Sequence, residues 1–142
     1  MRGARAYSGI DPYTGVGRTI NIEAGVIQSD EPCIAEGLPI FSPGLIDLQV
    51  NGYGGHDLND GELSAGKVEA LSEDLCREGI AAYLPTLITA DKNSICRRLS
   101  AIKEASEKLP YSRQMIAGIH IEGPHISSKD GPRGAHPREH IR

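Results

Sequence analysis

The chain has 142 residues, of which 39% are hydrophobic, and its 15 Lys and Arg against 19 Asp and Glu give a formal net charge of -4. This length and apolar fraction suit a globular chain with a buried core and argue against global disorder. No window combines a basic run with aromatic residues, which argues against nucleic acid as a partner. No apolar run reaches the roughly 20 residues that span a bilayer, so we expect no membrane partner and a cytoplasmic location.

The first 40 residues have the composition of short strands and turns. They are rich in glycine and polar residues and include the apolar and polar alternation Thr19-Ile20-Asn21-Ile22. Such alternation favours small antiparallel strands joined by turns. We therefore expect residues 1–40 to form a β-rich N-terminal segment.

From residue 41 onward, strand and helix signals alternate. Apolar runs over 45–50, 80–88 and 115–121 predict three strands that begin about 35 residues apart. Apolar residues at helical spacing follow the first two runs, one set ending before Gly79 and the other at Pro110. Nearly continuous apolar strands are typical of parallel sheets, which are buried on both faces. We therefore expect an α/β fold over residues 41–142.

Polar side chains follow two of these strands where functional groups of parallel α/β proteins collect. Gln49 and Asn51 come at the end of the first strand, and His120 and Glu122 come at the end of the third. Each pair shares a face because side chains alternate along a strand. A carboxylate and an imidazole at one strand end suit a metal site or an acid/base site. The segment 127–136 that follows has the composition of a mobile loop that closes over a ligand.

Three segments of the sequence resemble known families. The segment PGLIDLQVNGYGG (43–55) resembles the first barrel strand of the amidohydrolase superfamily. The segments GIHIEGPHIS (118–127) and GAHPRE (134–139) are similar to the HxEGP and GAH segments of N-acetylglucosamine-6-phosphate deacetylases. The resemblance implies that residues 41–142 form the first three strands of a (β/α)8 TIM barrel. It also implies that residues 1–40 belong to a small, incomplete β-sandwich domain.

The same resemblance implies a metal-dependent reaction. Glu122 matches the glutamate that binds the catalytic divalent metal. Burying a glutamate at the end of an apolar strand is costly without a strong partner, which favours this assignment over a simple loop cap. The cofactor is expected to be a divalent metal ion, with zinc preferred and iron or another divalent ion also suitable.

Other residues are expected to line or support the pocket. Ala135 matches a position that contacts substrate in the family, and His136 beside it is expected to line the same sugar-phosphate pocket. Gln49 and Asn51 stand where many amidohydrolases have His-x-His, and carboxamides are poorer ligands than imidazoles for zinc or iron. We therefore expect a single metal ion, with Gln49 and Asn51 as pocket or supporting residues. His120 is expected to support the site through hydrogen bonds rather than to bind metal.

Three histidines and one aspartate complete the candidates. Asp47, on the first strand, is expected to hydrogen-bond to backbone groups. His56, His125 and His140 receive no role.

The implied activity is the deacetylation of N-acetylglucosamine 6-phosphate to glucosamine 6-phosphate and acetate. In the family, two histidine ligands and a catalytic aspartate come from later strands, beyond Arg142, so no catalytic residue is assigned here. We expect the isolated chain to be an inactive fragment, and the resemblance implies that the full-length enzyme is a homodimer. Two alternatives stay open: an amidohydrolase acting on a cyclic amide or nucleobase, and a non-catalytic sugar-phosphate binding module.

Overall fold

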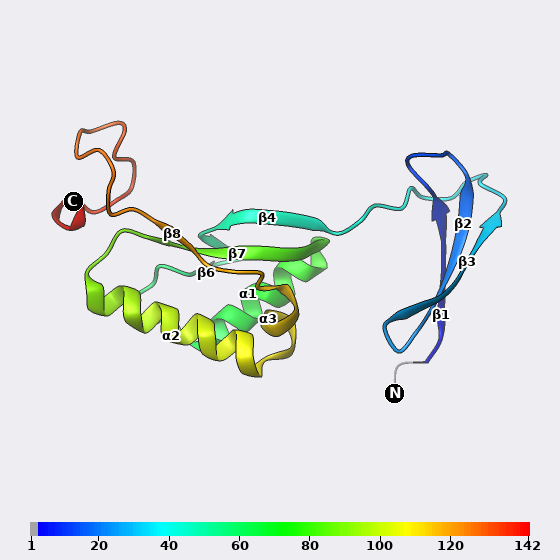
Figure 1. The fold of residues 1–142 in the computed structure, drawn as a ribbon, viewed down its shortest axis with the longest axis horizontal. Helices are drawn as coiled ribbons and strands as arrows, with labels where there is room; N and C mark the ends of the chain where they lie inside the picture. Colours follow the sequence, from blue (N-terminus) through cyan, green and yellow to red (C-terminus); the bar gives the residue numbers. More distant parts are fainter. Residues whose placement is uncertain (1–2) are drawn as a thin grey trace. The chain divides into compact units, whose positions relative to one another are not determined.

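The computed structural model describes residues 3–142 and divides the chain into two compact units, Met1–Pro43 and Gly44–Arg142 (Figure 1). The first two residues of the segment expected at 1–40 lie outside the described residues. Among the described residues, no helix is both long enough and apolar enough to cross a membrane.

The first unit contains an antiparallel sheet of β1 (Arg5–Ile10), β2 (Gly17–Glu23) and β3 (Val26–Cys33) in that order. The alternation at 19–22 therefore predicted a strand correctly. Strands β2 and β3 are joined by the two residues Ala24 and Gly25, with φ of 50° and 81°. Two consecutive residues with positive φ form a tight hairpin turn whose twist matches that of the strands.

The first unit continues to Pro43, three residues beyond the predicted division. The reason is backbone pairing with β1. The N–H of Ile10 donates to the carbonyl of Pro39 at 2.7 Å, and the N–H of Phe41 donates to the carbonyl of Ile10 at 2.8 Å. These bonds keep residues 39–41 with the first unit.

The second unit is built on a parallel sheet of β4 (Leu45–Val50), β7 (Ile80–Ile88) and β8 (His120–Glu122), with β7 in the centre. The predicted α/β class and the first two strands are confirmed. A short hairpin of β5 (Gly52–Tyr53) and β6 (His56–Asp57) follows β4.

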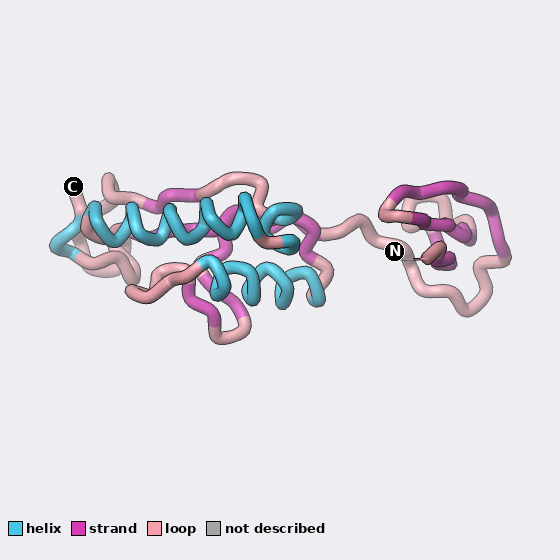
Figure 2. The backbone as a smooth tube through the Cα atoms, turned by 90° about the horizontal axis from the view of Figure 1, so that it is seen from below, coloured by secondary structure: helices cyan, strands magenta, loops and turns pink. Residues whose placement is uncertain are grey.

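Three helices cover one face of this sheet (Figures 1 and 2). They are α1 (Ala65–Arg77), α2 (Lys92–Lys108) and α3 (Pro110–Met115). The side chain of Asp91 caps α2 by accepting from the N–H of Ser94 at 3.0 Å. The chain closes with a single 3-10 turn, η1 (Arg138–His140).

The third predicted strand, over 115–121, was wrong in its extent. Only His120–Glu122 forms a strand, while Ile116 makes an isolated bridge to Tyr83. Met115, the first residue of the predicted strand, is the last residue of α3, which begins at Pro110 because proline is well suited to the first turn of a helix, where its missing N–H costs nothing.

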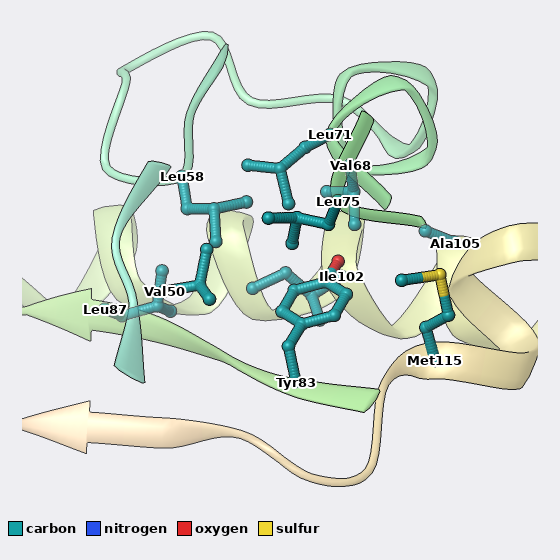
Figure 3. Close-up of a cluster of buried hydrophobic side chains, with 10 residues drawn as sticks. All are labelled: Val50, Leu58, Val68, Leu71, Leu75, Tyr83, Leu87, Ile102, Ala105 and Met115. Atoms are coloured by element: carbon teal, nitrogen blue, oxygen red, sulfur yellow. The ribbon is translucent and has the colours of Figure 1, made fainter. Parts of the chain in front are cut away.

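The core of the second unit lies between the sheet and the helices (Figure 3). Tyr83 and Leu87 point into it from the central strand, and Leu71 and Ile102 meet them from α1 and α2, all four with no exposed surface. The remaining buried members are Val50, Leu58, Val68, Leu75, Ala105 and Met115. This packing holds the three helices against the sheet.

A buried polar network joins α1, α3 and the central strand. Glu69 accepts from the N–H of Tyr111 at 2.9 Å and from both the N–H and the hydroxyl of Ser112, at 2.9 and 2.7 Å. The hydroxyl of Ser72 lies 3.0 Å from that of Ser112 and 2.8 Å from that of Tyr83. Burial raises the pKa of Tyr83 to about 12. Glu69 thus caps α3, whose own N-cap residue makes no side-chain hydrogen bond.

This cap predicts an acid-sensitive step in stability. Burial alone would raise the pKa of Glu69, but the hydrogen bonds from Ser112 and Tyr111 outweigh it, so the pKa is lowered. Between the two pKa values the unfolded chain therefore binds more protons than the folded one. The contribution of Glu69 to stability is fully present above about pH 4.3, the ordinary glutamate value. This contribution is lost as pH falls through the lowered pKa that Glu69 has in the folded state.

We expect Glu69→Gln to cost about 1–2 kcal/mol of unfolding free energy at pH 7, because hydrogen bonds to a charged group are lost. Urea unfolding from pH 7 down to pH 3 should show a shallower acid decline for the variant than for the wild type. Parallel acid limbs would show that Glu69 does not carry this linkage.

Candidate functional site

A cavity of about 490 Å³ opens at the carboxyl ends of the parallel strands. Five of the six predicted site residues line it: Gln49, Asn51, Glu122, Ala135 and His136. Gln49 and Asn51 come from the end of β4, Glu122 is the last residue of β8, and the other two lie in the loop that follows. Segments 70–90 residues apart in the sequence thus meet at one place.

Glu122 contacts two of the other residues that line the cavity. Its Oε2 accepts from the carboxamide Nε2 of Gln49 at 3.3 Å. Its Oε1 lies 3.3 Å from Nε2 of His136. The side chain of Glu122 is one-third exposed, so the carboxylate still faces the cavity with lone pairs to spare.

His136 is held in place on several sides and is only 8% exposed. Its Nδ1 lies 3.0 Å from the hydroxyl Oγ1 of Thr89 and 3.4 Å from the backbone N of Thr89. Its carbonyl accepts from the guanidinium of Arg133 at 2.8 Å, and Arg133 also pairs with Asp130 at 2.9 Å. These contacts hold His136 in place within the loop that follows β8.

Comparisons with known proteins bear on this site. No protein-family model matches the chain. An N-acetylglucosamine-6-phosphate deacetylase of Haemophilus influenzae is 39% identical over 102 residues, which are 72% of this chain and 25% of that enzyme. The same enzyme of Bacillus subtilis is 34% identical over 105 residues, with 72% and 26% covered.

Solved structures give the same result. The deacetylase of Thermotoga maritima matches with a TM-score of 0.72 and 27% identity over 95% of this chain and 35% of that chain. The deacetylase of Pasteurella multocida matches with a TM-score of 0.70 and 27% identity over 88% and 34%. The chain is related to N-acetylglucosamine-6-phosphate deacetylases. It spans about a quarter of the length of the two curated deacetylases named above.

The predicted residue His120 lies apart from the residues that line the cavity. Its Nδ1 is 3.4 Å from the carbonyl oxygen of Leu48 on β4, so it bridges two strands that are not neighbours in the sheet. Its supporting role in a deacetylase site stays a prediction. Asp47 accepts from the backbone N–H of Gln49 at 3.0 Å, as expected for a residue that binds backbone.

The donor set offers part of a metal site. Within residues 3–142, no group of three or more His, Cys, Asp or Glu side chains is placed to hold a metal ion. The cavity supplies the carboxylate of Glu122 and, near it, the imidazole of His136. A carboxylate is a suitable ligand for the divalent metals expected in a deacetylase. Glu122 therefore fits as one ligand of a metal site.

Sequence reasoning missed two residues that build the site. Thr89 contacts His136 and is 3% exposed. Asn59 clamps the end of β7, because its carboxamide donates to the carbonyl of Thr86 at 3.1 Å and accepts from the N–H of Ile88 at 2.9 Å. Neither belongs to a recognisable motif. The position of Thr89 directly after a buried strand was the only available signal.

Proposed function

We propose that the protein containing this chain deacetylates N-acetylglucosamine 6-phosphate, releasing acetate and glucosamine 6-phosphate. The observation that carries the proposal is the cavity in which Glu122, His136, Ala135, Gln49 and Asn51 meet. Glu122, Ala135 and His136 belong to the segments that resemble the deacetylase motifs, and Gln49 and Asn51 belong to the segment that resembles the first barrel strand of the amidohydrolases. The relationship to deacetylases at up to 39% identity supports it.

In this proposal Glu122 is a ligand of a divalent metal ion. When bound, such an ion lowers the pKa of water and polarises a carbonyl oxygen. Gln49 holds the carboxylate of Glu122 in place through its Nε2, at 3.3 Å. His136 and Ala135 contact the substrate, and His136 offers a hydrogen bond to the acetamide oxygen. Zinc is the preferred metal, with iron or another divalent ion as alternatives.

The proposal extends to the fold and the assembly. The second unit forms the first three strands of a (β/α)8 barrel, and the first unit forms part of a β-sandwich domain. The exposed apolar side chains of Leu45, Ile46 and Leu48, each 59–67% exposed, support this, because further strands would cover them. A homodimer is proposed on the family resemblance.

The test is acetate release by the intact protein that contains this chain. Purified protein loaded with zinc or iron is incubated with N-acetylglucosamine 6-phosphate, and acetate and free amine are both measured. We expect turnover of the phosphorylated sugar and much slower turnover of N-acetylglucosamine. Hydrolysis of a cyclic amide with no turnover of the sugar phosphate would move the protein to another amidohydrolase activity. Binding of the sugar phosphate without turnover would favour a non-catalytic module.

A further inference from the structure

Thr89 occupies a position that links the two central groups of the site. It follows β7 directly and is almost completely buried. Its hydroxyl lies between two acceptors, 3.0 Å from Nδ1 of His136 and 3.2 Å from the backbone carbonyl oxygen of Glu122. Its backbone N–H donates to the same Nδ1 at 3.4 Å. One residue therefore contacts both His136 and the backbone of Glu122.

The surroundings leave room for this hydroxyl and little else. A Cβ placed on Gly123 would lie 2.0 Å from the Thr89 hydroxyl and 3.8 Å from Nδ1 of His136. Only glycine at position 123 therefore allows the close approach of the three groups. The hydroxyl of Thr89 thus occupies the space that a side chain at position 123 would need.

The two ends of the imidazole ring face groups whose hydrogen-bonding roles are fixed. A backbone N–H can only donate, so Nδ1 of His136 accepts from Thr89. The ring proton is then on Nε2, which lies 3.3 Å from Oε1 of Glu122. The opposite tautomer would leave the N–H of Thr89 without an acceptor and turn a lone pair of Nε2 toward the carboxylate. Both costs act in a nearly buried site.

We propose that Thr89 is the positioning residue of His136: it holds Nδ1 as an acceptor and keeps the ring proton on Nε2, which faces the cavity beside Glu122. His136 is thereby a hydrogen-bond donor into the cavity. The consequence for catalysis rests on the proposed deacetylase function, because a donor at Nε2 is what an acetamide oxygen that gains negative charge requires. The tautomer itself does not depend on that function.

The test is nitrogen NMR of the histidine side chains in the intact protein at pH 7.5, with the His136 signals assigned through His136→Gln. We expect an unprotonated Nδ1 and a protonated Nε2. In Thr89→Val, which keeps the size of the side chain but removes the hydroxyl, Nδ1 keeps only the longer contact with the backbone N–H, so its signal should move toward that of an imidazole nitrogen that accepts no hydrogen bond. Thr89→Ser should restore the wild-type spectrum. A proton on Nδ1 of the wild type, or a Thr89→Val spectrum identical to that of the wild type, would overturn the proposal.

Kinetics provide the second measurement. Loss of a group that orients a functional histidine typically costs about 10–100-fold in activity. We expect Thr89→Val to lower kcat by that factor with KM changed less than about threefold, and Thr89→Ser to recover most of kcat. An unchanged kcat in Thr89→Val would overturn the positioning role. The predicted tautomer in a wild-type protein that does not deacetylate the sugar phosphate would refute the proposed function and leave the assignment of Thr89 intact.

Discussion

If Glu122 is the metal ligand of the proposed deacetylase, replacing it by glutamine should abolish both metal binding and deacetylation in the intact protein. The substitution keeps the size of the side chain but replaces a carboxylate by a carboxamide, which is a poor ligand for zinc or iron. It also replaces one acceptor oxygen by an NH2 group that faces Nε2 of either Gln49 or His136, whose contacts with Glu122 are both 3.3 Å long. We expect kcat/KM to fall by more than about 100-fold, beyond the typical loss for a residue that only orients a ligand.

Two measurements are needed on the same samples, metal content and acetate release. The matched control is Glu107→Gln on α2, which makes the same chemical change in a side chain that is 59% exposed. The control should keep its metal and its activity. If Glu122→Gln retains full metal content while activity falls, Glu122 acts on the substrate and not as a ligand. If both are retained, the metal site lies elsewhere and the proposed mechanism is wrong.

The parts of the site that could be predicted are those that follow from strand alternation and from motifs. Glu122 and His136 were predicted from a strand end and from the GAH segment, and the cavity brings both together. Thr89 could not be predicted in the same way. A threonine after a buried strand is common, and its role depends on a loop 47 residues later returning to it. Contacts of this kind are set by tertiary packing and leave no pattern in the local sequence.

The fold shows the same division. Apolar runs and helical spacing predicted β4, β7, α1 and α2, because each of these elements carries a long apolar pattern in its own sequence. A helix was predicted to end at Pro110 and a strand to begin at Met115, whereas residues 110–115 form a further helix. Besides Pro110 in its first turn, α3 has a cap from Glu69, which lies on a helix 42 residues earlier. Local propensity gave no indication of a cap supplied from that distance.

Gly123→Ala should destabilise the protein more than Gly79→Ala, although the two glycines have nearly the same backbone conformation. Their φ values are 88° and 86°. An alanine at either position pays the strain of positive φ, about 1–2 kcal/mol. A Cβ at position 79 meets nothing within 4 Å, whereas one at position 123 would lie 2.0 Å from the hydroxyl of Thr89. Overpacking of this kind adds about 1–3 kcal/mol, so we expect a total cost of about 3 kcal/mol at Gly123.

A double-mutant cycle separates the clash from the backbone strain. In Thr89→Ala the hydroxyl is gone, and the nearest remaining atom to a Cβ at position 123 is the Cβ of residue 89, at 3.4 Å. Gly123→Ala in that background should then cost about as much as Gly79→Ala in the wild type, and the coupling energy should equal the clash. Urea unfolding of the four proteins gives these values. Equal costs for Gly123→Ala in both backgrounds would mean that the loop after β8 yields to the new methyl group. Thr89 would then not be held tightly enough to position His136.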